Sequence, residues 1–248
     1  MQGLCGRCAG WVVSSAMVIW IALLPLICPA QEPSAYRMRA TFSGYTQTAA
    51  LTNLPVLILL SEDRQGFRYS QFASPDGHDL RFYDVSLTHE LAYEVESWDT
   101  NGTSCVWVRI PCLSNSSDSV WICWGDAAQT NQPAYTLDGT VWSEDYRLVL
   151  HMGDSQDAST NQAAGTSSNV AFDGGRIGDA GRFNGTSSML TFGHSNVLKP
   201  ASQITISAWV KPSGPLLALA FRTFIGRMIQ PIGICWRFKN TAPSSRLA

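Results

Sequence analysis

Hydrophobic and polar residues alternate along three short runs between Asp79 and Ile110, and turn residues separate the runs. In the last run, Val106, Val108 and Ile110 share one face, because successive side chains of a strand point to opposite sides. Long helical periodicity is absent, so the pattern predicts an all-β protein built as an antiparallel β-sandwich. Strands are expected over residues 36–43, 54–60, 79–84, 91–98, 104–110, 120–125 and 146–151, with the continuous apolar run 54–60 buried on both faces.

The N-terminal segment has the features of a targeting sequence. An uncharged, mostly apolar stretch fills residues 8–30, and Arg7 is the only charge before it. The small Ala30 fits cleavage before Gln31, so we predict a signal peptide over 1–30. The stretch is nearly long enough to span a bilayer, which leaves an uncleaved anchor as the alternative and the only expected membrane contact. In either case we expect the body to be exported to the periplasm, the cell surface or the medium.

The two strands that flank the polar cluster Ser114–Ser119 are predicted to form a hairpin. Matching their apolar faces places Cys105 opposite Cys123, and directly opposed residues have Cα atoms about 4.5 Å apart, near the short end of disulfide geometry. Export would supply an oxidising compartment. We therefore predict a disulfide between Cys105 and Cys123, with Cys112 as a competing partner.

The charge composition of the chain changes from mainly acidic to purely basic after Gly214. All 19 acidic residues lie before this glycine, whereas residues 215–248 contain basic residues but no Asp or Glu. The strand pattern stops at the same point. We interpret 215–248 as an atypical basic tail left by truncation or a frameshift, and a membrane-surface ending is the alternative. The net charge of −2 and the lack of a basic motif interleaved with aromatics give no reason to expect a nucleic-acid partner.

Several ordered motifs resemble a known family. They are Asp76–Phe82 (DGHDLRF), Leu91–Asp99 (LAYEVESWD), Val106–Pro111 (VWVRIP), Trp121–Gly125 (WICWG) and Val141–Met152, which ends in LVLHM. In this order they resemble the bacterial family catalogued as domain of unknown function 2341, and we assign it to residues 31–152. The resemblance implies an exported or surface protein, often beside carbohydrate-binding-like modules. It implies no agreed activity and no catalytic residues.

The following segment resembles a second family. Residues 181–185 (GRFNG) and 204–212 (ITISAWVKP) are similar to the opening strands of a concanavalin A-like lectin/glucanase domain of the laminin-G-like type. The resemblance implies an incomplete jelly-roll domain over 153–214. Asn184 stands where that family has an Asp, which argues against a metal ligand at this turn.

Two carboxylates are candidate catalytic acids. Glu94 and Glu96 are two positions apart on a predicted strand and therefore share a face. Retaining glycosidases use carboxylates about 5–5.5 Å apart, and the alternative is an ordinary solvated strand face. His151 lies in an apolar run and is interpreted as structural.

Two further groups are candidate ligand-binding residues. Asp76 and Asp79 lie in an oxygen-rich loop that could hold calcium, or could simply make turn hydrogen bonds. Trp98 and Asp99 end a strand, and an exposed indole with neighbouring hydrogen-bonding groups could contact a sugar. Core packing is the alternative for Trp98. No other cofactor is expected.

Together these observations predict an exported, non-enzymatic protein with a binding or adhesion role at the cell surface. Glycan is the expected class of ligand. One alternative is a fragment of a polysaccharide-degrading enzyme that uses Glu94 and Glu96. Another is a structural spacer in a larger surface protein.

Overall fold

The computed structural model describes residues 34–142, 145–192, 196–199 and 202–211. The segment 1–30 and the tail 215–248 lie outside the described residues, so the predictions made for them stay predictions. Described residues up to Leu198 belong to one compact unit, and those from Lys199 onward belong to a second. Within the described residues, no helix has the length and hydropathy that a membrane crossing requires.

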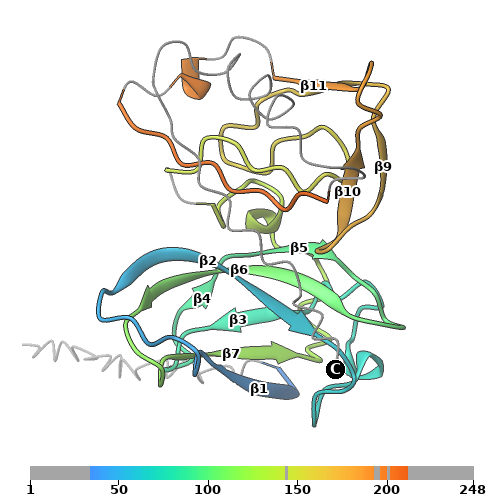
Figure 1. Cartoon of the computed structure of the whole chain (residues 1–248). Coiled ribbons are helices and arrows are strands. Elements are labelled where there is room, and N and C mark those ends of the chain that lie inside the picture. Colours follow the sequence, from blue (N-terminus) through green and yellow to red (C-terminus); the bar gives the residue numbers. More distant parts are fainter. Residues whose placement is uncertain (1–33, 143–144, 193–195, 200–201, 212–248) are drawn as a thin grey trace, which may run out of the picture. The chain divides into compact units, whose positions relative to one another are not determined.

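Strands account for most of the regular structure, and the described helices are single 3-10 turns (Figure 1). The strands are β1 (Tyr36–Thr41), β2 (Leu51–Leu60), β3 (Arg81–Tyr83), β4 (Glu90–Leu91), β5 (Tyr93–Ser97), β6 (Ser104–Leu113), β7 (Ser119–Trp124), β8 (Thr166–Ser168), β9 (Ala171–Gly174), β10 (Asp179–Arg182) and β11 (Met189–Thr191). The 3-10 turns are η1 (Tyr69–Gln71), η2 (Ala134–Thr136) and η3 (Asn196–Leu198).

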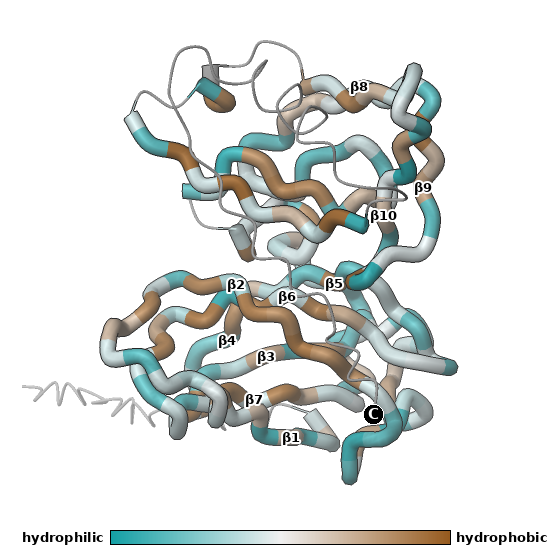
Figure 2. The backbone as a smooth tube through the Cα atoms, viewed as in Figure 1, coloured by the Kyte–Doolittle hydropathy of each residue, from teal (hydrophilic) through white to brown (hydrophobic). Residues whose placement is uncertain are grey.

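Two antiparallel sheets form a sandwich, which confirms the predicted fold class. One sheet has the order β1-β7-β3-β4 and the other β2-β6-β5. Figure 2 shows hydrophobic stretches along β2, β6 and β7. The alternation in β6 explains the layering, since Val106, Val108 and Ile110 are buried and belong to the common core.

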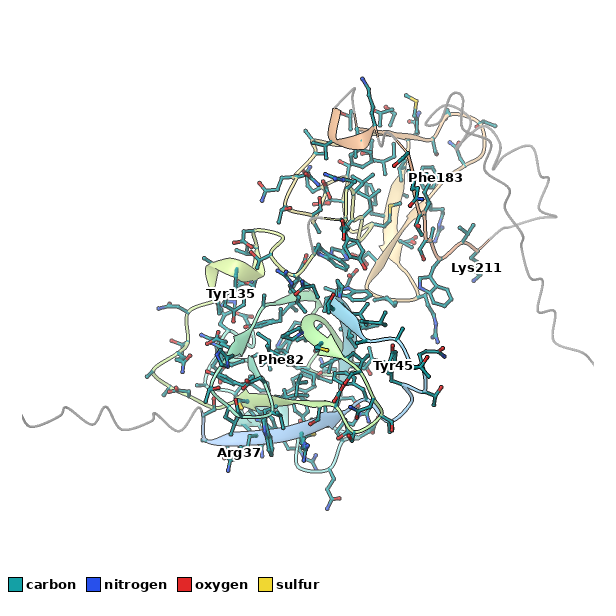
Figure 3. The ribbon with its side chains drawn as sticks, turned by 90° about the vertical axis from the view of Figure 1, so that its left-hand side faces the viewer. Arg37, Tyr45, Phe82, Tyr135, Phe183 and Lys211 are labelled. Carbon is teal, nitrogen blue, oxygen red and sulfur yellow. The ribbon has the colours of Figure 1, made fainter. Side chains whose placement is uncertain are left out.

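The core draws on both sheets and on the loop that contains η1. Phe82 of β3, labelled in Figure 3, is fully buried, and its ring packs against that of Tyr93 of β5 at an interplanar angle of 55°. Other large, fully buried side chains are Leu60, Phe67, Leu80, Val106, Val108, Ile122 and Trp124. Burial of this apolar surface is the main force that holds the two sheets together.

The predicted hairpin between β6 and β7 is wrong. β6 pairs with β2 and β5, whereas β7 pairs with β1 and β3. The loop at 114–118 therefore crosses from one sheet to the other. Cys105 and Cys123 alternate with core residues and so lie on the outer faces of opposite sheets. Both thiols are free, as is that of Cys112, and the predicted disulfide is not formed.

Three other strand predictions need correction. β2 is an edge strand and not buried on both faces, because Leu59 is 44% exposed. Its Pro55 fits this position, since proline cannot donate to a ladder. Residues 146–151 and 204–211 form no strand, and Trp209 in the latter segment is 80% exposed.

The chain after residue 145 contains short two-stranded ladders. β9 pairs with β10, and β8 pairs with β11, both antiparallel. Polar side chains hold this region: Asp157 accepts hydrogen bonds from the backbone N–H groups of Val149, Ser159 and Ala163, each at 2.9 Å. Asp157 and Ser159 are its buried residues among those described.

Candidate functional site

The acidic pair lies on the outer face of the sheet β2-β6-β5. Tyr93 of β5 points into the core, so by alternation Glu94 and Glu96 flank Val95 on the side away from it. Glu94 is directly opposite Trp107 of β6. The two candidate acids therefore share a face, as the spacing predicted.

This face is covered rather than solvated. The side chain of Glu96 is 3% exposed and that of Glu94 is 18% exposed. Trp107 donates its indole N–H to Glu96 at 2.8 Å, and Trp142 donates to Glu94 at 2.7 Å. The sequence-based alternative of an ordinary exposed strand face is thus wrong for these residues.

His151 lies between the two carboxylates. Its Nε2 is 3.0 Å from an oxygen of Glu94, and its Nδ1 makes an ion pair with Glu96. The ring also packs against Trp142, with centroids 5.7 Å apart. Both ring nitrogens face an acceptor, an arrangement that requires a proton on each and therefore the imidazolium form.

The electrostatics agree with that charge state. Burial lowers the pKa of His151, but the hydrogen bonds and charges of Glu94 and Glu96 outweigh burial and raise it from 6.5 to about 9. The cluster thus combines one positive and two negative charges. The cluster connects His151 to β5. On the same face of the sheet, Arg109 of β6 donates to the carbonyl of Thr140 at 3.1 Å and so connects β6 to the segment that precedes Trp142.

A close backbone approach completes the burial of Glu96. Gly178, in the turn between β9 and β10, has φ +56°, and a Cβ atom there would lie 2.6 Å from a carboxylate oxygen of Glu96. Only glycine fits this position without strain. Both carboxylates are therefore hydrogen-bonded or ion-paired to protein groups.

Trp98 lies in an aromatic cluster. Its ring centroid is 5.3 Å from that of Tyr69 and 5.1 Å from that of Phe72, both edge-on. Its indole N–H donates to the carbonyl of Pro75, and a Cβ on Gly77 would lie 2.5 Å from the ring. These contacts give Trp98 a packing role, and its contact with glycan stays a prediction.

A polar hollow of about 390 Å³ lies beside Asp99. Loop 61–63 forms one part of its lining, and loop 100–103 forms the other. Asp99 shapes the second loop by accepting the backbone N–H of Asn101 at 3.0 Å, while its own N–H donates to the Ser104 hydroxyl. The residues that line the hollow carry hydroxyl, amide and carboxylate groups.

The candidate calcium ligands are not brought together. Asp79 is fully buried, and its oxygens accept the backbone N–H groups of Ala73, Ser74 and Gly125 at 2.7–3.0 Å. Asp76 is exposed in the preceding loop. In the part of the chain that the structure describes, no three His, Cys, Asp or Glu side chains are grouped to hold a metal. Asp79 instead fastens two loops through turn hydrogen bonds.

The comparisons with known proteins address the sandwich. Residues 76–144 match the family model described as Domain of unknown function (DUF2341). No curated protein and no solved structure matches the chain. The match supports the first resemblance drawn from the sequence. Neither it nor the structure shows the concanavalin A-like domain expected over 153–214.

The DUF2341 match includes most of the acidic cluster. Glu94, Glu96, Trp107 and Trp142 lie within the matched residues, whereas His151 follows them. Sequence reasoning missed the indole donors and the partnership of His151 with both acids. The available signal was one histidine in an apolar run that follows a Val-Trp pair, which does not reveal its partners.

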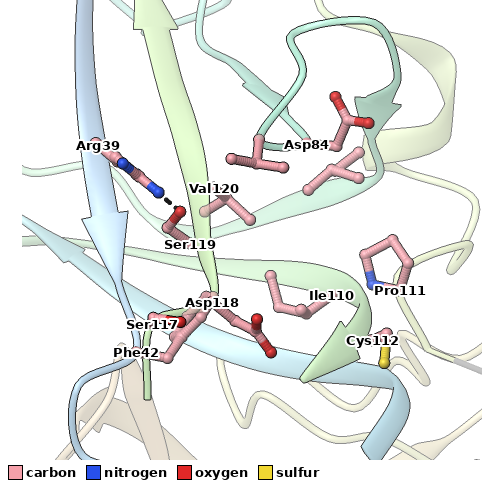
Figure 4. A pocket seen from close by; sticks show the side chains of 12 residues that line it. Arg39, Phe42, Asp84, Ile110, Pro111, Cys112, Ser117, Asp118, Ser119 and Val120 are labelled. Atoms are coloured by element: carbon pink, nitrogen blue, oxygen red, sulfur yellow. Dashed lines mark hydrogen bonds between the residues drawn. The ribbon is translucent and has the colours of Figure 1, made fainter. Parts of the chain in front are cut away.

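A second hollow, about 250 Å³, opens between the two sheets of the sandwich (Figure 4). Arg39 at its edge donates to the hydroxyl of Ser119 at 2.8 Å. The carboxylates of Asp84 and Asp118 accept backbone N–H groups of their own loops. The exposed Cys112 borders the hollow. Its lining is otherwise mainly apolar, so it offers few groups for a polar ligand.

Proposed function

We propose that this chain is an exported, non-catalytic module that binds glycan at the cell surface. Its non-catalytic character rests on the protein groups that occupy both carboxylates of the acidic pair, and the binding role rests on the polar hollow. Glu96 is buried beneath Trp107 and His151, and Glu94 is bonded to Trp142 and His151. A catalytic pair must meet the glycosidic bond with both carboxylates. This pair instead fastens one segment of the chain to another.

The polar hollow is the best-supported place for the glycan. Its volume of about 390 Å³ falls within the usual range of small-molecule sites, about 300–1,000 Å³. Asp63 contributes acceptors, Asn101 contributes both donors and an acceptor, and Thr103 contributes a hydroxyl. Sugar hydroxyl groups both donate and accept hydrogen bonds, which suits such a mixed lining.

Glycan-array binding tests the proposal directly. The wild-type chain should bind at least one class of polysaccharide, and Asp63→Ala should weaken that binding by about tenfold, the loss expected for a hydrogen bond to a charged group. Asp145→Ala is a matched control, because Asp145 is exposed and does not line the hollow. Binding that Asp63→Ala leaves unchanged would place the glycan elsewhere.

Experiments with the same protein and the same polysaccharides distinguish two other functions, a polysaccharide-degrading enzyme and a structural spacer. A fragment of a polysaccharide-degrading enzyme would release reducing ends and lose that activity in Glu94→Gln. A structural spacer would bind no polymer at all. The resemblance of residues 153–214 to a concanavalin A-like domain supports the glycan proposal, and it belongs to the proposal alone.

A further inference from the structure

The tetrapeptide Asn-Gly-Thr-Ser occurs twice, at residues 101–104 and 184–187. Both asparagines are exposed. An Asn-Gly pair is chemically reactive, because glycine has no side chain to keep its backbone nitrogen away from the preceding amide carbon. The two sites share the reacting pair and the two residues after it, so a difference between them must come mainly from the fold.

The fold restrains the side chain of Asn184. Its Oδ1 accepts the backbone N–H groups of Thr186, Ser187 and Ser188 at 2.9–3.0 Å. Its Nδ2 donates to the Ser187 hydroxyl at 3.0 Å. Any rotation that brings the amide carbon to the nitrogen of Gly185 must disturb this network.

Asn101 lacks such restraint. Its backbone N–H donates to Asp99, but the described residues offer its side-chain amide no hydrogen-bond partner. The N–H of Gly102 reaches the carbonyl of Asp99 only at 3.3 Å, which is long for a hydrogen bond. A Cβ on Gly102 would crowd a carboxylate oxygen of Asp99, so a bulkier residue there would displace that side chain.

We infer that Asn101 is a site of spontaneous deamidation and that the fold protects Asn184 from the same reaction. The backbone nitrogen of Gly102 loses its proton to solvent and attacks Cγ of Asn101. The new N–Cγ bond closes a succinimide, while the Cγ–Nδ2 bond breaks and releases ammonia. Water then opens the ring and yields aspartate or isoaspartate. Nothing is oxidised or reduced.

The product adds one negative charge to the polar hollow. Asn101 lines that hollow together with Glu62 and Asp63, so the lining becomes more acidic as the protein ages. The reaction goes beyond the proposed function, because it proceeds whether or not the hollow holds a glycan.

Peptide mapping by mass spectrometry tests the inference on the full chain. Trypsin places the two sites in separate peptides, because Arg109 and Arg182 lie between them. After incubation in mildly alkaline buffer, Asn101 should convert at least about tenfold faster than Asn184, the factor that one to two net hydrogen bonds supply. In concentrated urea the two rates should converge.

A variant tests the protection separately. Ser187→Ala removes the acceptor of the Asn184 amide, so deamidation at Asn184 should accelerate several-fold while Asn101 in the same sample stays unchanged. Equal rates at the two sites in the native chain, faster reaction at Asn184, or an unreactive Asn101 would each overturn the inference.

Discussion

The sandwich at residues 34–142 and the region at 145–192 are stabilised in different ways. The sandwich buries a continuous apolar core, in which Phe67, Phe82 and Trp124 are almost completely enclosed. In the later region, the described buried residues are the polar Asp157 and Ser159. Apolar burial holds many elements together cooperatively, whereas side-chain bonds to backbone fix one loop at a time. The DUF2341 match lies within the first region, apart from its last two residues.

The largest difference should appear on truncating an aromatic residue in the core. Trp124 is 1% exposed and stacks on Phe72, so Trp124→Ala should lower the free energy of unfolding by about 3–5 kcal/mol. Leu190→Ala in β11 should cost below about 1.5 kcal/mol, because that side chain is only half-buried. Urea titrations measure the free energy of unfolding of both variants. Similar losses in the two variants would contradict the division into two kinds of region.

The His151 cluster joins the two regions and should make stability depend on pH. The pKa of His151 is raised from 6.5 to about 9, so its stabilising effect is complete below pH 6.5. The effect should fade as pH rises through 9, with a total change of up to about 3 kcal/mol. Denaturation at several pH values measures it, and Glu96→Gln should flatten the profile. A wild-type profile that rises over this interval would show that the sign is wrong.

Removing Asp157 should loosen the later region without unfolding the sandwich. Its carboxylate fixes the chain near Val149 and Ala163. Asp157→Ala should therefore speed protease cleavage near these residues, while the main urea transition shifts by less than about 0.5 kcal/mol. Asp154→Ala is a control, since Asp154 is exposed and makes one such backbone bond. A large loss of global stability in Asp157→Ala would show that the regions fold as one unit.

The smallest effect should come from reducing agents. Cys105 and Cys123 lie on opposite sheets, so reductant should leave the unfolding of the sandwich unchanged. Burial raises the pKa of the Cys123 thiol to about 11, and its reaction with a thiol reagent should be slow until the chain unfolds. Cys112 is exposed and should react first. A peptide that contains a Cys105–Cys123 bridge would restore the original prediction.

Local pattern predicted the strands better than their pairing. The strand expected at 104–110 exists as Ser104–Leu113, and its buried face is the predicted one. Its partner was missed because a short polar loop can close a hairpin or cross between two sheets. The apolar run at 146–151 gave a false strand, since contacts with Asp157 and Asn161 hold that segment instead.

The candidate site shows the same limit. The i, i+2 spacing correctly placed Glu94 and Glu96 on one face. The spacing could not show that His151, more than fifty residues later, covers that face. When a segment far along the chain buries a strand face, the strand's own alternation of residues does not change. The burial of Glu96 therefore could be seen only in the structure.

The charge state of His151 tests most directly whether the acidic pair anchors the chain. NMR of the imidazole nitrogens should show both protonated near neutral pH, with a midpoint of titration near 9 in the wild-type chain. Glu96→Gln should move the midpoint toward 6.5, because one of the two carboxylates that hold the proton is lost. A neutral imidazole at neutral pH, with a midpoint at or below 6.5, would contradict the anchoring role and return both carboxylates to the candidates for catalysis.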